Sequence, residues 1–376
     1  MRVCIAADSF KGTYSSLEVA DLIAAGIRRV YPQAEIDKLP VADGGEGTLA
    51  ALAGDAKRLS LTVRDPIGRP VQASYAIGAD GTAFIEMAQA SGLCLLSEAE
   101  RAPLAASTYG TGELILDALN RGCTRLIIGL GGSATTDGGT GMAAALGVWF
   151  SDSDGRPLPP GGDALRRLAE IDCSGLDPRL QKVDVLAACD VENPLCGPTG
   201  AAAVYAPQKG ADAKAVARLE QGLQRFADVC TVRFGRNIKT LPGAGAAGGA
   251  GAGLVLFCGA KLVRGIDLIL DNAGTAERMQ AADVIVTGEG RTDGQTAFGK
   301  VVAGVAARGR AYKKPVFAVS GSVCSSELAA VYAAGLDAAV SCVTAPMTLE
   351  EVIADSAQLI PDAAERLFRI ILAMRR

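Results

Sequence analysis

Apolar and polar residues alternate along the first forty residues with two periods that predict a strand, a helix and a second strand. The apolar run 2–7 predicts a short buried strand. Apolar residues then recur with a helical period over 15–31, where Ser15 and Glu18 have the spacing of a capping box. A second strand is expected at 35–40. These segments predict a strand–helix–strand unit.

The last third of the chain repeats this alternation. Strands are predicted in ADVIVTGEG, PVFAVSGS and DAAVSCVT, and helices in GKVVAGVAARGRAYKK and SSELAAVYAAG. A final helix is predicted to begin at Thr348, with Glu351 completing a second capping box. Alternating strands and helices imply a parallel sheet with helices on both faces.

The middle of the chain has a different pattern, which predicts a separate domain. Residues 71–77 alternate strictly, 78–81 form a turn, and the strand returns, as in a hairpin of a mixed sheet. The expected fold class is therefore α/β with two domains and a cleft between them. A discontinuous Rossmann-like parallel-sheet domain is assigned to 1–66 and 280–376, and an inserted mixed α/β domain to 67–279.

Composition excludes several kinds of chemistry. The chain of 376 residues contains no histidine, which excludes Ser–His–Asp and Cys–His catalysis and leaves general-base work to Asp, Glu, Lys or Tyr. The ten cysteines include no C-x-x-C pair, so no zinc site is expected. The net charge of −4 gives no electrostatic footprint for nucleic acid or an anionic membrane.

The sequence also indicates where the protein works. Its start lacks the basic segment and apolar run of a signal peptide. The longest uncharged run, 242–260, is rich in Gly and Ala, and we expect a glycine-rich loop leading into a buried helix, not a membrane span. We therefore expect a cytoplasmic protein with reduced cysteines.

Polar residues follow many of the predicted strands at the point where each strand ends. In open parallel sheets, ligands bind beyond the carboxyl ends of the strands, so these loops are expected to line a ligand site. Each motif also has a plainer interpretation as a helix cap, a turn or a surface lysine. The segments are Asp8–Lys11, Asp43–Thr48, Gly131–Ser133, Asp190 with Asn193, Gly288–Gly290 and Ser320–Ser322.

Two glycine-rich loops suit phosphate, because backbone N–H groups without side chains can close around phosphate oxygens. These loops are 131–139 and 243–249, and each is followed by a helix. The candidate phosphate-binding residues in them are Gly131, Gly132, Ser133, Gly138, Gly139, Gly245 and Gly248.

A third stretch, GQTAFGKV at 294–301, matches seven of the eight positions of a P-loop. Val301 replaces the required Ser or Thr, and GEGRTD separates the stretch from its strand, so we reject a P-loop. Lys300 remains a candidate phosphate contact as a point charge. Glu289 and Asp293 are candidate magnesium ligands.

At this point the sequence resembles the bacterial, Rossmann-containing glycerate kinases over essentially its whole length. The segments that carry the resemblance are ADSFKGTYSSLEVA, LPVADGGEGT, STYGTGELI, GGSATTDGGTGM, DVENPLCGPTGAAAVYAPQKGA, GAGAAGG and TGEGRTDGQTAFGK. Small departures are Ala7 where Pro is frequent, Thr136 where Asn is common, and Phe298 where His is frequent. None of them removes a candidate acid or base.

The resemblance implies phosphorylation of D-glycerate with ATP and Mg²⁺, usually to 2-phosphoglycerate and in some relatives to the 3-phosphate. D-glycerate is then the expected partner, without nucleic acid or membrane, and a homodimer is left open. Phosphoryl transfer to an alcohol needs a carboxylate base and a metal. Asp190 is the candidate base, with Asp293 and Lys11 as further catalytic candidates and Asp137 in reserve. Substrate contacts are assigned to Asp8, Ser9, Lys11 and Asn193, and metal contacts to Asp43, Glu289 and Asp293.

Two other functions remain as alternatives. An NAD-dependent oxidoreductase of a small hydroxy acid would also use a parallel sheet with glycine loops. The G-x-G-x-x-G fingerprint should then follow the first strand, where this chain has ADSFKG. A non-catalytic protein that binds a small acid is the second alternative, and the many carboxylates and lysines in the polar loops argue weakly against it.

Overall fold

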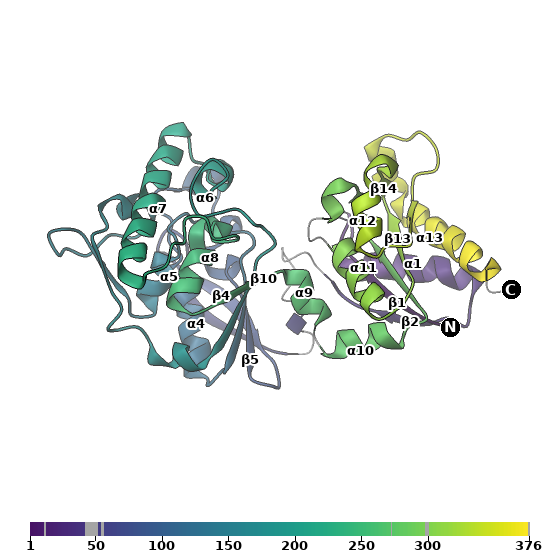
Figure 1. Ribbon diagram of the computed structural model, residues 1–376, viewed down its shortest axis with the longest axis horizontal. Helices are drawn as coiled ribbons and strands as arrows, with labels where there is room; N and C mark the ends of the chain where they lie inside the picture. The colour runs from purple at the N-terminus through teal and green to yellow at the C-terminus, as the bar shows by residue number, and fades with distance from the viewer. Residues whose placement is uncertain (11–12, 42–51, 54–55, 272, 298–300, 375–376) are drawn as a thin grey trace. The chain divides into compact units, whose positions relative to one another are not determined.

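The computed structural model describes residues 1–10, 13–41, 52–53, 56–271, 273–297 and 301–374. Contacts divide the chain into two compact units, one formed by Met1–Asp43 with Arg264–Arg376 and the other by Gly44–Val263. Both chain ends therefore belong to the first unit, whose purple and yellow-green segments lie side by side in Figure 1. Strands and helices alternate in both units, which confirms the predicted α/β class.

The first unit is built on five parallel strands in the order β15-β13-β11-β1-β2. The interior strand β1 lies between β11 and β2 and places Ile5 opposite Val286 of β11 and Lys38 of β2. Every residue of β1 after Arg2 is buried, as expected for a strand covered on both faces. The strands are β1 (Arg2–Ala7), β2 (Glu35–Lys38), β11 (Val284–Gly288), β13 (Val316–Ser320) and β15 (Ala338–Ser341).

Helices cover both faces of this sheet, as predicted. On one face Val3, Ile5 and Ala7 share a core with α1 and α13. On the other, Gly309 of α11 lies against Val316. The helices are α1 (Ser16–Val30), α9 (Gly265–Leu270), α10 (Ala273–Ala281), α11 (Val301–Ala311), α12 (Ala329–Ala334) and α13 (Leu349–Ala373), with short helices η6 (Gly294–Ala297) and η7 (Ser325–Glu327) and a small parallel pair, β12 (Arg291–Thr292) and β14 (Ser322–Val323).

Both predicted capping boxes are present at the starts of α1 and α13. The Ser15 hydroxyl accepts from the N–H of Glu18, and the Glu18 carboxylate accepts from the N–H of Ser15. Thr348 and Glu351 make the same reciprocal pair. Each box satisfies helix N–H groups that have no partner inside the helix, which fixes where the helix begins.

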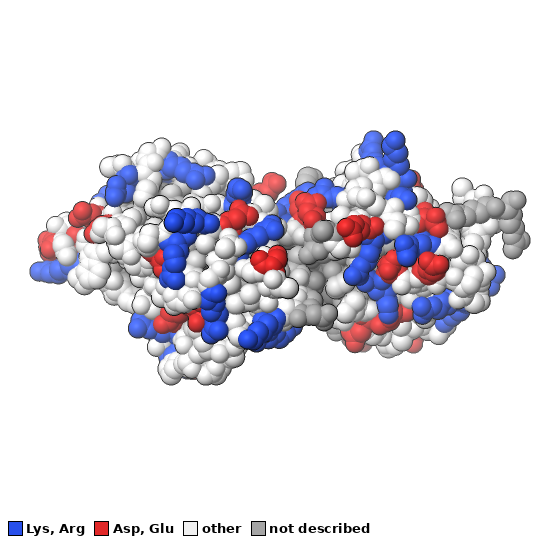
Figure 2. All heavy atoms as spheres, turned by 90° about the horizontal axis from the view of Figure 1, so that it is seen from below, with Lys and Arg blue, Asp and Glu red and all other residues white. Residues whose placement is uncertain are grey.

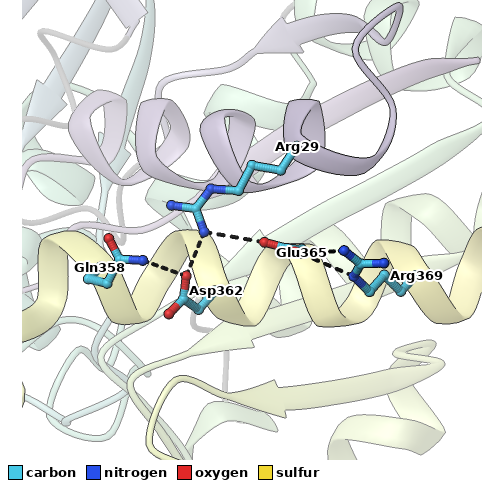
Figure 3. A network of polar contacts seen from close by, with 5 residues as sticks. All are labelled: Arg29, Gln358, Asp362, Glu365 and Arg369. Atoms are coloured by element: carbon cyan, nitrogen blue, oxygen red, sulfur yellow. Dashed lines mark hydrogen bonds and ion pairs between the residues drawn. The ribbon is translucent and has the colours of Figure 1, made fainter.

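The helices α1 and α13 approach each other very closely. A Cβ atom at Gly26 of α1 would lie 2.1 Å from the carbonyl oxygen of Pro361 in α13. On the exposed side of the contact, Arg29 pairs with Asp362 and Glu365 of α13 (Figure 3). The apolar core and this ion-pair network hold the same two helices together.

The second unit contains a mixed sheet of six strands in the order β10-β9-β6-β5-β4-β3. Strands β5, β6, β9 and β10 are parallel, whereas β3, β4 and β5 pair antiparallel. The predicted hairpin is confirmed as β4 and β5. The strands are β3 (Lys57–Arg64), β4 (Pro70–Ile77), β5 (Thr82–Glu86), β6 (Arg125–Gly129), β9 (Asp184–Ala188) and β10 (Lys261–Val263).

The observed units differ from the sequence-derived domain boundaries at both junctions. Residues 57–64 were assigned to the first domain, yet β3 pairs with β4 along its whole length. Residues 264–279, assigned to the inserted domain, form α9 and most of α10 in the first unit. Local patterns identify a strand or a helix but do not say which sheet it joins, because that depends on distant partners.

Helices divide the second unit into two hydrophobic cores, with α8 between them. Ala250 and Leu254 of α8 pack with the sheet and α4, whereas Ala252 and Phe257 pack with α7. This confirms the buried helix predicted for the uncharged run, and no helix in the described part of the chain is long and apolar enough to cross a membrane. The remaining elements are α3 (Ala88–Ser91), η1 (Leu93–Leu95), η2 (Glu98–Glu100), α4 (Tyr109–Asn120), α5 (Thr140–Ala145), β7 (Trp149–Ser151), η3 (Gly162–Arg167), β8 (Glu170–Asp172), η4 (Pro178–Lys182), α6 (Ala201–Tyr205), η5 (Pro207–Lys209), α7 (Ala213–Phe234) and α8 (Ala246–Phe257).

Candidate active site

In the first unit, the predicted polar residues lie at the carboxyl edge of the parallel sheet. Asp8 follows β1 and is buried, and its Oδ1 accepts hydrogen bonds from the N–H and hydroxyl of Ser9. The N–H of Asp8 donates to the carbonyl of Gly288 at the end of β11, 2.8 Å away. Asp8, Ser9 and the residues after β11 are therefore neighbours at one sheet edge, as expected for a parallel sheet.

Glu289, the residue after β11, is the acceptor of a chain of buried hydroxyl groups. Its Oε1 accepts from the hydroxyl of Thr292 at 3.1 Å and from that of Thr296 at 2.6 Å. The Ser320 hydroxyl at the end of β13 lies 2.7 Å from the Thr292 hydroxyl. This network fixes one oxygen of Glu289 and joins two neighbouring strand ends.

Asp293 makes contacts that are typical of a turn and helix cap. Its Oδ1 accepts from the N–H of Gln295 at the start of η6, and its Oδ2 pairs with Arg291 at 3.0 Å. The side chain is 16% exposed. These contacts fit the plainer interpretation of Asp293 and leave its assigned role in metal binding or catalysis a prediction.

Three of the predicted site residues, Lys11, Asp43 and Lys300, lie outside the described residues. Among those that are described, no three His, Cys, Asp or Glu side chains come close enough together to hold a metal ion. Magnesium is usually held by one or two carboxylates together with substrate phosphates, so a site formed by Glu289 and Asp293 would not need a third carboxylate, and their role in metal binding stays a prediction.

In the second unit, the structure brings the two predicted glycine-rich loops into direct contact. The N–H of Gly138 donates to the carbonyl of Gly248 at 3.1 Å. The N–H of Gly245 donates to the carbonyl of Asn193, in the loop after β9, at 3.0 Å. The loops after β6 and β9 and the start of α8 therefore meet at the carboxyl edge of the parallel strands.

Four of the glycines predicted to contact phosphate are packed against protein. A Cβ at Gly248 would lie 2.0 Å from the Thr135 carbonyl oxygen, and one at Gly245 would lie 2.2 Å from that of Pro194. Gly138 and Gly139 have φ angles of 66° and 77°, and their N–H groups are bonded to Gly248 and Asp137. These glycines permit positive φ and close backbone packing, which other residues tolerate poorly.

Residues 131–137, named here the donor loop, carry unpaired hydrogen-bond donors. Within the described part of the chain, the backbone N–H groups of 131–133 and 135–137 have no hydrogen-bond partner. Gly131 and Gly132 are at least partly open to solvent, whereas the hydroxyls of Thr135 and Thr136 are buried without a partner there. Buried donors are normally paired, so a run of unpaired donors indicates a place for a ligand or ordered water.

Lys209 is the functional candidate that the sequence analysis missed. Its ammonium group is buried and donates to the Ser133 hydroxyl at 2.9 Å and to the Thr135 carbonyl at 2.5 Å. Burial lowers the pKa of Lys209 to about 7, and the charge of Asp137 opposes this shift. In the sequence Lys209 stands in APQKGA, at the end of a segment that carries the resemblance to glycerate kinases, and its residue type and position do not indicate a role.

Asp137, the reserve carboxylate, is fully buried and surrounded by donors. It accepts from the N–H and hydroxyl of Thr108 and from the N–H groups of Gly139 and Gly141. Burial raises the pKa of Asp137, and these hydrogen bonds oppose the shift. Each of these groups donates a hydrogen bond, which suits an ionised carboxylate. We infer that Asp137 holds the donor loop against α4 and α5.

Asp190 and Asn193 follow β9, as predicted, but their surroundings differ. The amide of Asn193 donates to the Thr199 carbonyl and accepts from the Tyr205 hydroxyl, so both of its ends hold the loop before α6. Asp190 is partly exposed. The geometry favours a turn role for Asn193 and keeps Asp190 accessible at the sheet edge.

Comparison with known proteins places the chain among enzymes of one kind. A model of the glycerate kinase family matches residues 3–372. The chain is 47% identical over 361 residues to a glycerate kinase of Bacillus subtilis, covering 95% of this chain and 94% of the relative. It is 45% identical to the glycerate 2-kinase of Escherichia coli over 354 residues, 93% of each chain. A crystal structure from Salmonella typhimurium, provisionally named glycerate kinase 2, superposes with a TM-score of 0.86 at 43% identity and covers 100% of this chain and 99% of its own. The chain therefore belongs to the glycerate kinase family.

Proposed function

We propose that this protein transfers the terminal phosphoryl group of ATP to D-glycerate in the presence of Mg²⁺ and forms 2-phosphoglycerate. Full-length similarity to enzymes named glycerate kinase supports the substrate, and the relative named glycerate 2-kinase supports the position. The single structural observation that carries the proposal is the donor loop, whose unpaired N–H and hydroxyl groups suit the phosphates of a nucleotide.

Within the donor loop, Gly131, Gly132 and Ser133 are the proposed phosphate contacts. Only Leu130 separates them from the end of β6, and their N–H groups have no partner among the described residues. Gly138, Gly139, Gly245 and Gly248 contribute by shaping the loop, because protein atoms occupy the space beside them. Lys300 stays a proposed point-charge contact.

Substrate and base are assigned to the ends of different strands. Asp8 and Ser9 after β1, with Lys11, are proposed to hold the carboxylate and hydroxyls of glycerate. Asp190 after β9 is proposed to accept the proton of the attacking hydroxyl, with Asp293 as the alternative base. Glu289 and Asp293, with Asp43, would hold Mg²⁺, which neutralises charge on the phosphates when bound. The predicted cleft between the two domains stays a prediction.

Label transfer tests the proposal directly. The purified protein is incubated with D-glycerate, Mg²⁺ and ATP labelled in its terminal phosphate, and the product is identified by ³¹P NMR. We expect label in 2-phosphoglycerate and none when Mg²⁺ is chelated. Label in the 3-phosphate would reject the assigned position, and reduction of NAD by glycerate without label transfer would favour the oxidoreductase. Glycerate binding without either reaction would indicate the non-catalytic alternative.

A further inference from the structure

Lys209 is a lysine in a place where lysines are rare. It is 2% exposed, although lysine is almost never fully buried unless it is paired. It ends η5, and its two hydrogen bonds reach back across more than seventy residues of sequence to Ser133 and Thr135 in the donor loop. The fold therefore uses one buried cation to connect the segment after α6 to the loop after β6.

The bond to Thr135 has a directional consequence for the next residue. The chain contains no cis peptide bond within its described part, so the C=O of Thr135 and the N–H of Thr136 point in opposite directions. By holding the Thr135 carbonyl, Lys209 turns the Thr136 N–H away from itself. That N–H has no partner among the described residues, and neither has the buried Thr136 hydroxyl.

Asp137 is the acidic neighbour of Lys209 in the part of the chain that the structure describes. It lies on the donor loop, and its negative charge raises the pKa of the lysine against the effect of burial. Arg101 packs beside Gly210, the residue after Lys209. A Cβ atom added to Gly210 would lie 3.1 Å from the Cβ of Arg101. The Asp137 carboxylate is already bonded to Thr108, Gly139 and Gly141, so it does not hydrogen-bond the ammonium group.

We propose that Lys209 is a positioning residue of an anion site: it holds the donor loop with its unpaired donors directed at a polyphosphate and supplies the positive charge behind them. The identification of this anion as the phosphates of ATP rests on the proposed kinase function. The buried hydroxyls of Thr135 and Thr136 are the independent observation that indicates a ligand at this loop.

Proton uptake follows from this arrangement. Burial holds the pKa of Lys209 near 7, so only part of the molecules carry the charge at neutral pH. An anion brought close to Lys209 favours the protonated form and raises this pKa. Binding of a polyphosphate at pH 7.5 should therefore take up a fraction of one proton, and the affinity should fall as the pH rises from 7 to 9.

Isothermal titration calorimetry in HEPES and in Tris tests the proposal, because the difference in apparent enthalpy reports the protons exchanged. The probes are ATP and inorganic tripolyphosphate, added to the full-length protein and to Lys209→Met. We expect the variant to bind both probes at least tenfold more weakly and to take up less proton than the wild type. Lys214→Met, an exposed lysine at the start of α7, is the matched control and should behave as the wild type.

Lys209→Gln separates position from charge, because its amide can still donate to Thr135 but cannot titrate. We expect an intermediate affinity, no proton uptake, and a raised KM for ATP with a glycerate KM within about twofold of the wild type. This variant carries the test if Lys209→Met does not fold. Wild-type affinity in both variants, or unchanged proton uptake in Lys209→Gln, would overturn the proposal.

Failure of the kinase function is distinguishable, because tripolyphosphate binding requires no phosphoryl transfer. A wild-type protein that binds tripolyphosphate with proton uptake, but transfers no label to glycerate, would keep the Lys209 proposal and reject the proposed reaction.

Discussion

At the residue scale, burial gives Lys209 a pH dependence that an exposed lysine would lack. Its folded-state pKa of about 7 lies below the ordinary value of 10.5. Between these values the unfolded chain binds the proton and the folded chain does not, so the free energy of unfolding rises with pH. We expect the wild type to gain stability relative to Lys209→Met from pH 7 to 9 in urea titrations. A constant difference across that range would contradict the depressed pKa.

Gly132 and Gly248, in the two glycine-rich loops proposed to bind ATP, should respond differently to substitution by valine. Gly132 has a φ of 71° and is exposed, so Gly132→Val should weaken ATP at least tenfold and leave the glycerate KM within about twofold. Gly248→Val should also lower the melting temperature, because its side chain would collide with the Thr135 carbonyl. Gly155→Val, with a φ of 76° and open space around it, controls for backbone strain alone. Normal ATP binding by Gly132→Val and Gly248→Val would assign these glycines to packing.

Asp190 is the carboxylate on which the proposed chemistry depends most. We expect Asp190→Asn to lower kcat by about 10²-fold or more while ATP binding stays intact, because the hydroxyl proton loses its acceptor. Asp184→Asn, at the exposed start of the same strand, is the matched control. Steady-state kinetics and circular dichroism measure the effect and the fold. Near-normal kcat in Asp190→Asn would transfer the base assignment to Asp293.

At the element scale, the contact of α1 with α13 should be unusually sensitive to one methyl group. Gly→Ala within a helix normally stabilises it by up to about 1 kcal/mol. Here the new Cβ of Gly26→Ala would meet the Pro361 carbonyl at 2.1 Å, so the helices must separate and we expect a net loss of about 1–3 kcal/mol. Ala25→Leu adds a larger side chain at the neighbouring exposed position and should be nearly neutral. If Gly26→Ala and the wild type have equal free energies of unfolding in urea, α1 and α13 can separate at this contact with little loss of stability.

At the scale of the whole molecule, the hydrophobic core of the first unit is separate from the two cores of the second, so we expect the two units to have different melting temperatures. A ligand at one hundred times its Kd stabilises the native state by about 2.7 kcal/mol. We expect saturating ATP to slow amide hydrogen exchange in peptides that cover β6 and the donor loop. Mass spectrometry of the exchanged peptides measures this, with Gly132→Val as the control. Unchanged exchange at saturation would place the nucleotide elsewhere.

Charge at this scale gives no indication of a macromolecular partner. The net charge is −4, and Lys and Arg are interspersed with Asp and Glu on the face shown in Figure 2. On this face the charges are mixed and form no basic stripe of the kind that nucleic acid binding uses. The electrostatic features that matter for the proposed reaction are instead local and buried, at Lys209, Asp137 and Glu289.

The sequence by itself determined the elements whose causes are local. The capping boxes at Ser15 and Thr348, the hairpin of β4 and β5, and the buried helix in the uncharged run all follow from residues close in sequence. The sequence also showed which polar loops follow predicted strands. These loops share one edge because a parallel sheet brings the carboxyl ends of its strands together. The resemblance to glycerate kinases was visible too, since it is carried by short quoted segments.

Only the tertiary structure decided what surrounds each polar residue. It placed Gly248 against Thr135, buried Asp137 among donors, and joined β3 to the second sheet. It also brought Lys209 to the donor loop, across a sequence distance that no local pattern spans. The physical reason is that burial and hydrogen bonding depend on the whole packed unit, so the ionisation and accessibility of a side chain cannot be inferred from its neighbours in sequence.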